Sequence, residues 1–380
     1  MTSKLPESLF ADIGDLRQKY EKDEMAQSFA LSRTYPPQFS NEEAVGAPSY
    51  KRGSEHLFKF NLNFDAAVVV VRHLYSVIGL QHRQSEAMTT EEQNHPILRL
   101  IWADFEDESG AAALSILRHE MQVRDDPKGT MTVFQLFEQP AMWKSLWAKP
   151  PFQLFHPTLL GKLRGATEWQ IIKHHADIEE ESLVEWDGTD TLGAYISTLF
   201  GQTIDPETGS EFVESFNYSA IIRVRYKHTT SSRPPATYQD LRRIQIAPRR
   251  LKRDSNNPNV MVRAAAAQDD ERVAYTLIAV VRCADPGTES DRIRLYNVVG
   301  QPLSLPISLH AYVGTRWNIG DATDPNRVYL LFYAQTPLDP ISGQNEEPIA
   351  RTELNTGRLI DAMKGSLLPA HQPTGEGSSG

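Results

Sequence analysis

The hydrophobic pattern of the first half of the chain is mainly that of helices. Residues 6–29 place Leu9, Ile13, Leu16 and Tyr20 on one helical face. Residues 189–200 carry a helix-start signal, with Thr189 or Asp190 as the expected cap. Two further segments, 110–123 and 140–149, also predict helices. Residues 34–56 are polar and predict a linker.

The pattern changes after residue 215, where apolar runs become β-branched and aromatic. Turn-prone segments such as 284–290 and 320–326 separate several of these runs. Helices followed by strands predict an α+β fold with an antiparallel sheet. The expected strands lie within residues 218–226, 272–283, 291–299, 309–314 and 327–335.

The stretch NFDAAVVVVRHLYS, residues 63–76, fits either a buried strand or a helix. Four consecutive valines, Val68–Val71, follow a short polar start. A helix on the surface would alternate apolar and polar positions, so the valines predict burial on all sides. If the segment is a helix, we expect it to be central and packed against residues 275–282 and 328–334.

Composition sets bounds on the class of protein. The chain has 380 residues, enough for one large domain with tails or for two domains. It has no apolar run of membrane-spanning length and no signal-peptide core near its start, which predicts a soluble protein of the cytoplasm or nucleus. The net charge of −10 disfavours nucleic-acid binding and suits a basic partner. The single cysteine, Cys283, excludes an internal disulfide and a CxxC zinc site.

The order of several segments resembles the ubiquitin-specific protease domain, a papain-like cysteine peptidase fold with thumb, palm and fingers. NFDAAVVVVRHLYS resembles the first active-site helix of that family, and residues 159–200 resemble the fingers and the next helix. The later segments that carry the likeness are YSAIIRVRYKH, IQIAPRRL, YTLIAVVRCADPGTESDRIRLY and RWNIGDATDPNRVYLLFYAQ. The resemblance implies a domain at 56–336, after an N-terminal helix and linker at 1–55 and before a mobile tail at 337–380.

The resemblance places the nucleophile position at Asp65, or at Asn63 or Ala66 in neighbouring registers. None of these residues is a thiol, a serine or a threonine, so no register supplies the nucleophile of a cysteine peptidase. The alternative interpretation of Asp65 and Asn63 is simple helix N-capping.

The other catalytic positions are also degenerate. The histidine position of the family falls on Arg292 in one register and on Ser308 in another, with His310 as a fallback base on the same strand face as Ser308. Asp321 matches the orienting acid, although an aspartate in a Gly-Asp turn is usually only a turn residue. Cys283 lies at a strand end, which predicts a small packed residue.

The segments that correspond to the family's zinc knuckles contain no cysteine, and His174 and His175 are adjacent and diverge, so no metal and no cofactor is expected. Two charge clusters remain. The acidic stretch with Asp177, Glu179, Glu180 and Glu181 is either a solvated loop or a docking surface for the basic tail of ubiquitin. The basic stretch 242–253 predicts a strand edge protected by charge, or a nuclear localisation or phosphate-binding patch.

The sequence thus predicts a ubiquitin-specific-protease-like pseudoenzyme that binds ubiquitin, a ubiquitin-like modifier or another protein. One alternative is an active cysteine-type deubiquitinase that uses an unrecognised site, such as Cys283 with His310. A second alternative is an α+β protein-interaction module unrelated to ubiquitin. Geometry around Asp65 discriminates between them, because a cleft there that faces Arg292 or His310 supports the family resemblance, whereas a filled core excludes the enzyme.

Overall fold

The computed structural model describes the main body of the chain. The described residues are 13–21, 23–33, 35–36, 54–106, 114, 118, 131–156, 158–167, 170–173, 182–229, 234–247, 251–253, 261–263, 272–284, 290–303, 317–321 and 327–337. Of residues 54–61 only the helical backbone is described. The predicted strand at 309–314 and most of the predicted helix at 110–123 lie outside these residues.

The N-terminal region forms two short helices instead of the single predicted one. They are α1 (Leu16–Lys19) and α2 (Glu24–Arg33). The chain turns between them at Glu21, which has a φ of 43°. A second helix then starts because the Asp23 carboxylate accepts a hydrogen bond from the Ala26 amide at 2.9 Å.

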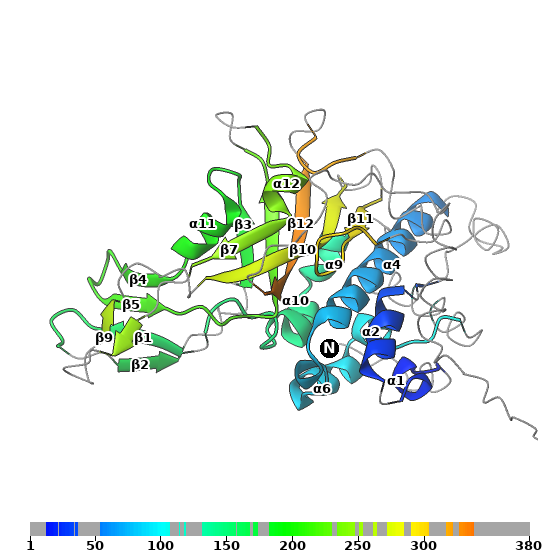
Figure 1. The fold of residues 1–380 in the computed structure, drawn as a ribbon, viewed down its shortest axis with the longest axis horizontal. Coiled ribbons are helices and arrows are strands. Elements are labelled where there is room, and N and C mark those ends of the chain that lie inside the picture. Colours follow the sequence, from blue (N-terminus) through cyan, green and yellow to red (C-terminus); the bar gives the residue numbers. More distant parts are fainter. Residues whose placement is uncertain are drawn as a thin grey trace, which may run out of the picture.

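Residues 63–76 lie in one long helix, α4 (Ser54–Val77), as predicted for the helical alternative. Val68–Val71 are at most 2% exposed, and they share a core with residues of the sheet. Shorter helical segments surround α4 (Figure 1). They are α5 (Leu80–Arg83), α6 (Glu86–Asn94), α7 (Pro96–Arg99), α9 (Val133–Phe137), α10 (Pro140–Met142) and the π-helix η2 (Trp143–Trp147).

Six of the described strands form the central sheet, in the order β11-β10-β12-β6-β3, with β7 also paired to β10. The pairs are antiparallel as predicted, except that β3 runs parallel to β6. The strands are β3 (Leu183–Trp186), β6 (Ile221–Lys227), β7 (Arg243–Ile246), β10 (Val273–Cys283), β11 (Arg292–Leu295) and β12 (Val328–Thr336).

The central sheet separates two hydrophobic cores. Alternation along β12 sends Leu330 and Phe332 into the core with α4 and α9, and Tyr329 and Leu331 into the other core. The second core also contains residues of α11 (Leu192–Thr198) and α12 (Tyr238–Leu241). The sheet therefore carries helices on both faces, which makes it buried on both sides.

A second, four-stranded sheet extends to one side of this body (Figure 1). Its order is β2-β1-β5-β4, and all its pairs are antiparallel. It lies in the region that the sequence resemblance assigned to the fingers. The strands are β1 (Thr158–Lys162), β2 (Gln170–Lys173), β4 (Gly201–Ile204) and β5 (Glu211–Glu214), and a separate pair is formed by β8 (Leu251–Arg253) and β9 (Met261–Arg263).

Helix α11 confirms the helix predicted at 189–200 but not its cap. The N-cap is Thr191, and neither Thr189 nor Asp190 takes that position. Asp187 instead closes the preceding turn, because its Oδ1 accepts a hydrogen bond from the Thr189 amide at 3.0 Å. The helix therefore begins after the turn is complete.

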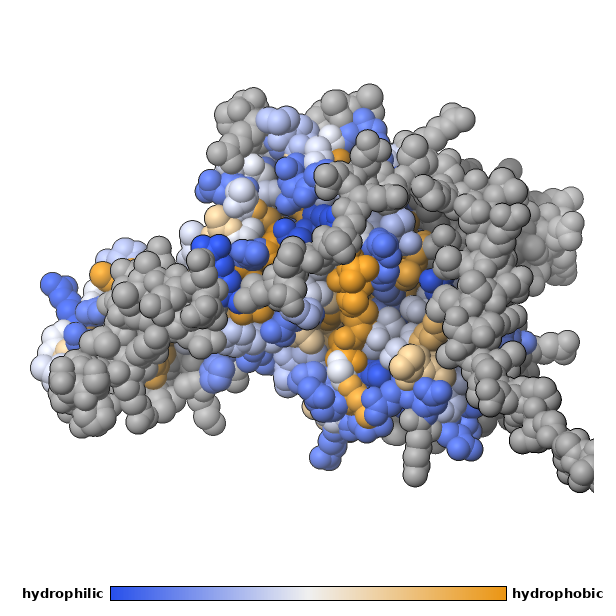
Figure 2. Space-filling model, viewed as in Figure 1, coloured by the Kyte–Doolittle hydropathy of each residue, from blue (hydrophilic) through white to orange (hydrophobic). Residues whose placement is uncertain are grey.

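The N-terminal helices belong to the same core as α4, since Leu16, Ala30 and Leu31 are buried in it. On the face drawn in Figure 2, hydrophobic residues come into view mainly in a band over the middle of the molecule. Among the helices of the described part of the chain, none combines the length and apolar character that a membrane span requires.

Candidate functional site

The resemblance locates a degenerate catalytic centre at residues 63–66, and the structure places these residues in the interior of α4. The helix begins at Ser54, well before Asn63. Asn63 is 3% exposed, and Asp65 and Ala66 are fully buried. The N-capping interpretation of Asn63 and Asp65 is therefore wrong, because a cap lies at a helix end. For the same reason these positions lack the free N–H groups that activate a thiol.

Asp65 is held in a buried ion pair with Arg118. The Arg118 Nε donates to Asp65 Oδ1 at 2.8 Å, and its Nη2 donates to Oδ2. The Arg118 side chain is only 5% exposed. A bidentate pair of this kind satisfies a buried carboxylate and fixes its orientation. This arrangement gives Asp65 a structural role.

Asn63 lies at the centre of a second buried network. Its Nδ2 donates to the Met131 carbonyl at 3.0 Å, and its Oδ1 accepts from the Asp291 amide at 2.9 Å. The Asp291 carboxylate in turn accepts from the Ala284 amide at 2.6 Å and from the Val133 amide. The network ties together α4, the start of α9, the end of β10 and the start of β11.

Arg292, one of the two residues at the histidine position, directly follows Asp291. It is the first residue of β11, where it pairs with Arg282, and it is half-buried. A guanidinium stays protonated and cannot act as a general base. Ser308 and His310, which the other register uses, lie outside the described residues.

Asp321 lies in a turn, and its amide donates to the Asn318 carbonyl at 3.3 Å. The segment before it packs on β11, because the Arg294 guanidinium stacks 4.2 Å from the Trp317 ring centre and donates to the Trp317 carbonyl. Asp291, which directly precedes β11, and the segment from Trp317 to Asp321 therefore both lie beside this strand.

Cys283 is buried at the end of β10. Burial raises the pKa of its thiol well above the usual value, and the nearby Asp291 carboxylate raises it further. A thiol in this environment stays protonated and is a poor nucleophile. The environment of Cys283 therefore does not support the alternative in which this residue is the nucleophile of an active peptidase.

The acidic residues Asp177, Glu179, Glu180 and Glu181 lie outside the described residues, so their docking role stays a prediction. Within the described part, no group of three or more histidine, cysteine or acidic residues has the arrangement of a metal site.

Sequence reasoning missed the partners of the polar residues in α4. Arg118 and Asp291 are far from α4 in sequence, and no local pattern marks either of them as a partner. The only available signal was the presence of Asn63 and Asp65 directly before an apolar run, since buried polar groups need hydrogen bonds.

Comparison with known proteins gives neither a matching family model nor a matching curated protein. Similar solved structures include the pseudoubiquitin hydrolase–RNA exonuclease module of Saccharomyces cerevisiae Pan2 in complex with AAGGAA RNA, at 9% identity and a TM-score of 0.26. That likeness covers 90% of this chain and 58% of the yeast chain. The Neurospora crassa Pan2 catalytic unit has 10% identity and a TM-score of 0.24, over 81% of this chain and 58% of that one.

The chain thus spans little more than half the length of these structures. TM-scores of this size do not establish a shared fold.

Proposed function

We propose that this protein is a catalytically inactive, ubiquitin-specific-protease-like module that binds another protein. One observation carries the proposal: the hydrogen bond between Asn63 and the Asp291 amide, within a buried network at the position where the resemblance puts the nucleophile. A hydrolase needs an open cleft with an activated nucleophile at this place. The buried, hydrogen-bonded side chains of Asn63 and Asp65 at this position support an inactive chain.

Ubiquitin or a ubiquitin-like modifier is the partner that the proposal favours. The support is the family resemblance of the sequence together with charge, because the chain carries a net charge of −10 and the tail of ubiquitin is basic. In this proposal the acidic residues Asp177, Glu179, Glu180 and Glu181 meet that tail. Charges at an interface rim mainly raise the association rate and make it salt-dependent.

The experiment is a titration of the full chain with ubiquitin at low salt, observed by NMR. We expect binding that is roughly micromolar or weaker, because the site adds no covalent step. A triple variant, Glu179→Lys, Glu180→Lys and Glu181→Lys, should slow association and reduce its salt dependence, with an unchanged circular dichroism spectrum.

A matched control reverses three exposed acids elsewhere, Glu86, Asp190 and Glu207, which changes the net charge by the same amount. If both triple variants lose association rate equally, only the overall charge matters and the docking surface is wrong. If the wild type shows no binding up to near-millimolar ubiquitin, ubiquitin is not the partner. The interaction module unrelated to ubiquitin would then be the better description.

A further inference from the structure

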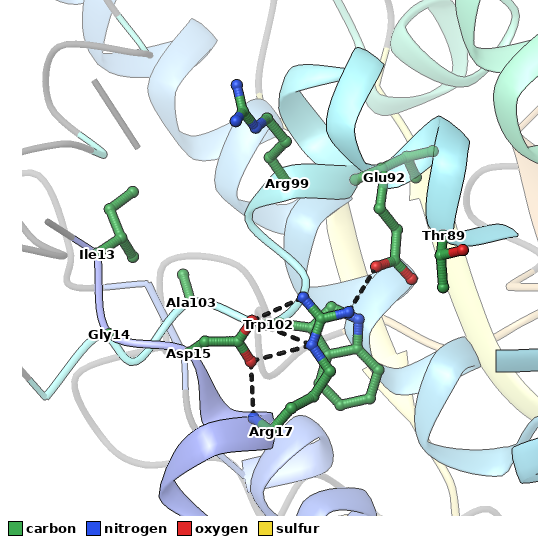
Figure 3. A pocket seen from close by; sticks show the side chains of 10 residues that line it. Ile13, Gly14, Asp15, Arg17, Thr89, Glu92, Arg99, Trp102 and Ala103 are labelled. Carbon is green, nitrogen blue, oxygen red and sulfur yellow. Dashed lines mark hydrogen bonds and ion pairs between the residues drawn. The ribbon is translucent and has the colours of Figure 1, made fainter. Parts of the chain in front are cut away.

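A pocket of about 220 Å³ lies between the N-terminal segment and the helices α6 and α7, and its charges are balanced within the chain. The Arg17 guanidinium lies 2.6 Å from Asp15 Oδ2 and 2.9 Å from Glu92 Oε2 (Figure 3). Arg99 also lines the pocket, so two cations stand against two carboxylates. The residues that line this pocket therefore offer no unmatched charge to a ligand.

The outer edge of β3 (Leu183–Trp186) differs from this pocket, because its backbone is open to a partner. The strand ends the central sheet on one side, and it pairs in parallel with β6, from Leu183 opposite Arg223 to Trp186 opposite Tyr226. Among the described residues, its other edge makes no backbone hydrogen bond. An open strand edge is a row of N–H and C=O groups that can pair with an added strand.

The side chains of β3 alternate between a covered face and a more exposed one. Val184 and Trp186 are at most 5% exposed, and they belong to the second core together with residues of α11. Leu183 and Glu185 lie on the other face, where the Glu185 side chain is 59% exposed. A strand added beside β3 would therefore meet apolar side chains on one face and a carboxylate on the other.

The sequence around β3 is acidic. Residues 177–190 contain seven aspartates and glutamates and neither lysine nor arginine. Glu185 pairs with Arg225 of β6 at 3.1 Å, and Lys227 of the same strand is exposed, so β6 offsets at most two of the seven charges. A segment that pairs with the edge of β3 is therefore favoured if it carries cations.

We propose that the outer edge of β3 binds an extended, basic segment of a partner protein by strand addition. Backbone hydrogen bonds to β3 give this contact its affinity. Side chains give it specificity, with a basic residue beside Glu185 and apolar residues on the face of Val184 and Trp186. The expected segment therefore alternates basic and apolar residues. Strand addition at β3 rests on the binding role proposed above and specifies how the partner is held.

The test uses the full chain and the peptide acetyl-Val-Arg-Val-Arg-Val-amide, with the backbone amide signals of Leu183–Trp186 followed by NMR. We expect a saturable shift of these signals with roughly millimolar affinity, because a short peptide loses conformational freedom when it binds. The peptide acetyl-Val-Glu-Val-Glu-Val-amide has the opposite charge, and it should bind about tenfold more weakly or less.

Methylation of the peptide backbone separates strand addition from a simple charge contact. The N–H groups of alternate residues point to opposite edges of a strand, so N-methyl groups on the arginines block one edge and N-methyl groups on the valines block the other. Only one edge of the peptide faces β3. One of the two methylated peptides should therefore lose binding, and the other should keep it.

Glu185→Lys should weaken binding of the arginine peptide by about fivefold, because an attractive cross-strand pair becomes a repulsive one. Glu207→Lys is the matched control, since it makes the same charge change at an exposed residue between β4 and β5. It should change the affinity by less than about twofold, because salt screens charges that lie far from the peptide.

Strand addition at β3 is overturned by the absence of a saturable shift up to about 10 mM peptide, by equal affinity of the two methylated peptides, or by equal losses in the two variants. The peptide comparisons need only the wild type, so they stand even if a variant fails to fold. Peptide binding at β3 without ubiquitin binding would reject ubiquitin as the partner and keep the site. Ubiquitin binding without peptide binding would reject the site and keep the binding role.

Discussion

Asn63 is a polar residue in the interior of a buried helix, and its amide joins α4 to Met131 and Asp291. We predict that Asn63→Ala lowers the free energy of unfolding by about 1–3 kcal/mol, because both hydrogen bonds are lost in a buried environment. Urea denaturation followed by circular dichroism measures this change. Gln18→Ala, an amide removed from the exposed face of α1, is the control and should change stability by less than about 0.5 kcal/mol. Equal effects of the two substitutions would contradict a structural role for Asn63.

His73 is a second buried polar residue of α4. Its Nε2 lies 2.9 Å from the Tyr296 carbonyl and 3.1 Å from the Ile278 carbonyl, so it links the helix to the sheet. Burial lowers the pKa of His73 to about 4, so the imidazole is neutral in the folded chain.

In the unfolded chain, His73 has the ordinary histidine pKa of about 6.5. As the pH falls, the unfolded chain therefore binds a proton at His73 before the folded chain does. The contribution of His73 to stability is therefore complete above about pH 6.5 and is lost as the pH falls toward 4, by up to about 3 kcal/mol. Between these pH values, the free energy of unfolding from urea denaturation should fall more steeply with decreasing pH for the wild type than for His73→Gln. His156→Gln, at an exposed histidine, should run parallel to the wild type. Parallel curves for His73→Gln would show that His73 is not held neutral by burial.

At the scale of elements, α11 approaches β7 so closely that a glycine is required. A Cβ built on Gly193 would lie 2.4 Å from the Gln245 carbonyl oxygen. Gly193→Ala should therefore destabilise the protein by about 1–2 kcal/mol, since overpacking outweighs the helix propensity gained. Thermal unfolding by circular dichroism measures the shift. Gly79→Ala is the control, because its Cβ would meet only the flexible Gln81 side chain at 3.4 Å. A neutral Gly193→Ala would mean that the helix can move away from the strand at no cost.

The elements with a self-contained pattern could be predicted from the sequence. The four valines of α4 and the apolar runs of β10 and β12 are buried on all sides. Because each run is continuous and apolar, its local pattern is enough to predict a buried element. The start of α4 could not be predicted, because Asn63 and Asp65 look like a polar helix start. Their actual environment depends on Asp291 and Arg118, which are distant in sequence.

The described part of the molecule is a central sheet with helices on both faces, plus a smaller four-stranded sheet to one side and the separate pair of β8 and β9 (Figure 1). The α+β class and most of the antiparallel pairing followed from the order of helical and strand patterns. The parallel pairing of β3 with β6 did not, because short strands such as Leu183–Trp186 carry no signal for their direction.

We propose that this chain is catalytically inactive, because buried hydrogen bonds hold Asn63 and Asp65 at the positions where the sequence resemblance puts the nucleophile. Losing members of a catalytic triad lowers rates by several orders of magnitude, and the positions that the resemblance assigns to the nucleophile carry no thiol. The most direct test is incubation of the full chain with a ubiquitin electrophile probe, with intact mass as the readout and Cys283→Ser as the control. We expect that neither the wild type nor Cys283→Ser gains the mass of ubiquitin. Labelling of the folded wild type that disappears in Cys283→Ser would contradict it and identify an active cysteine peptidase.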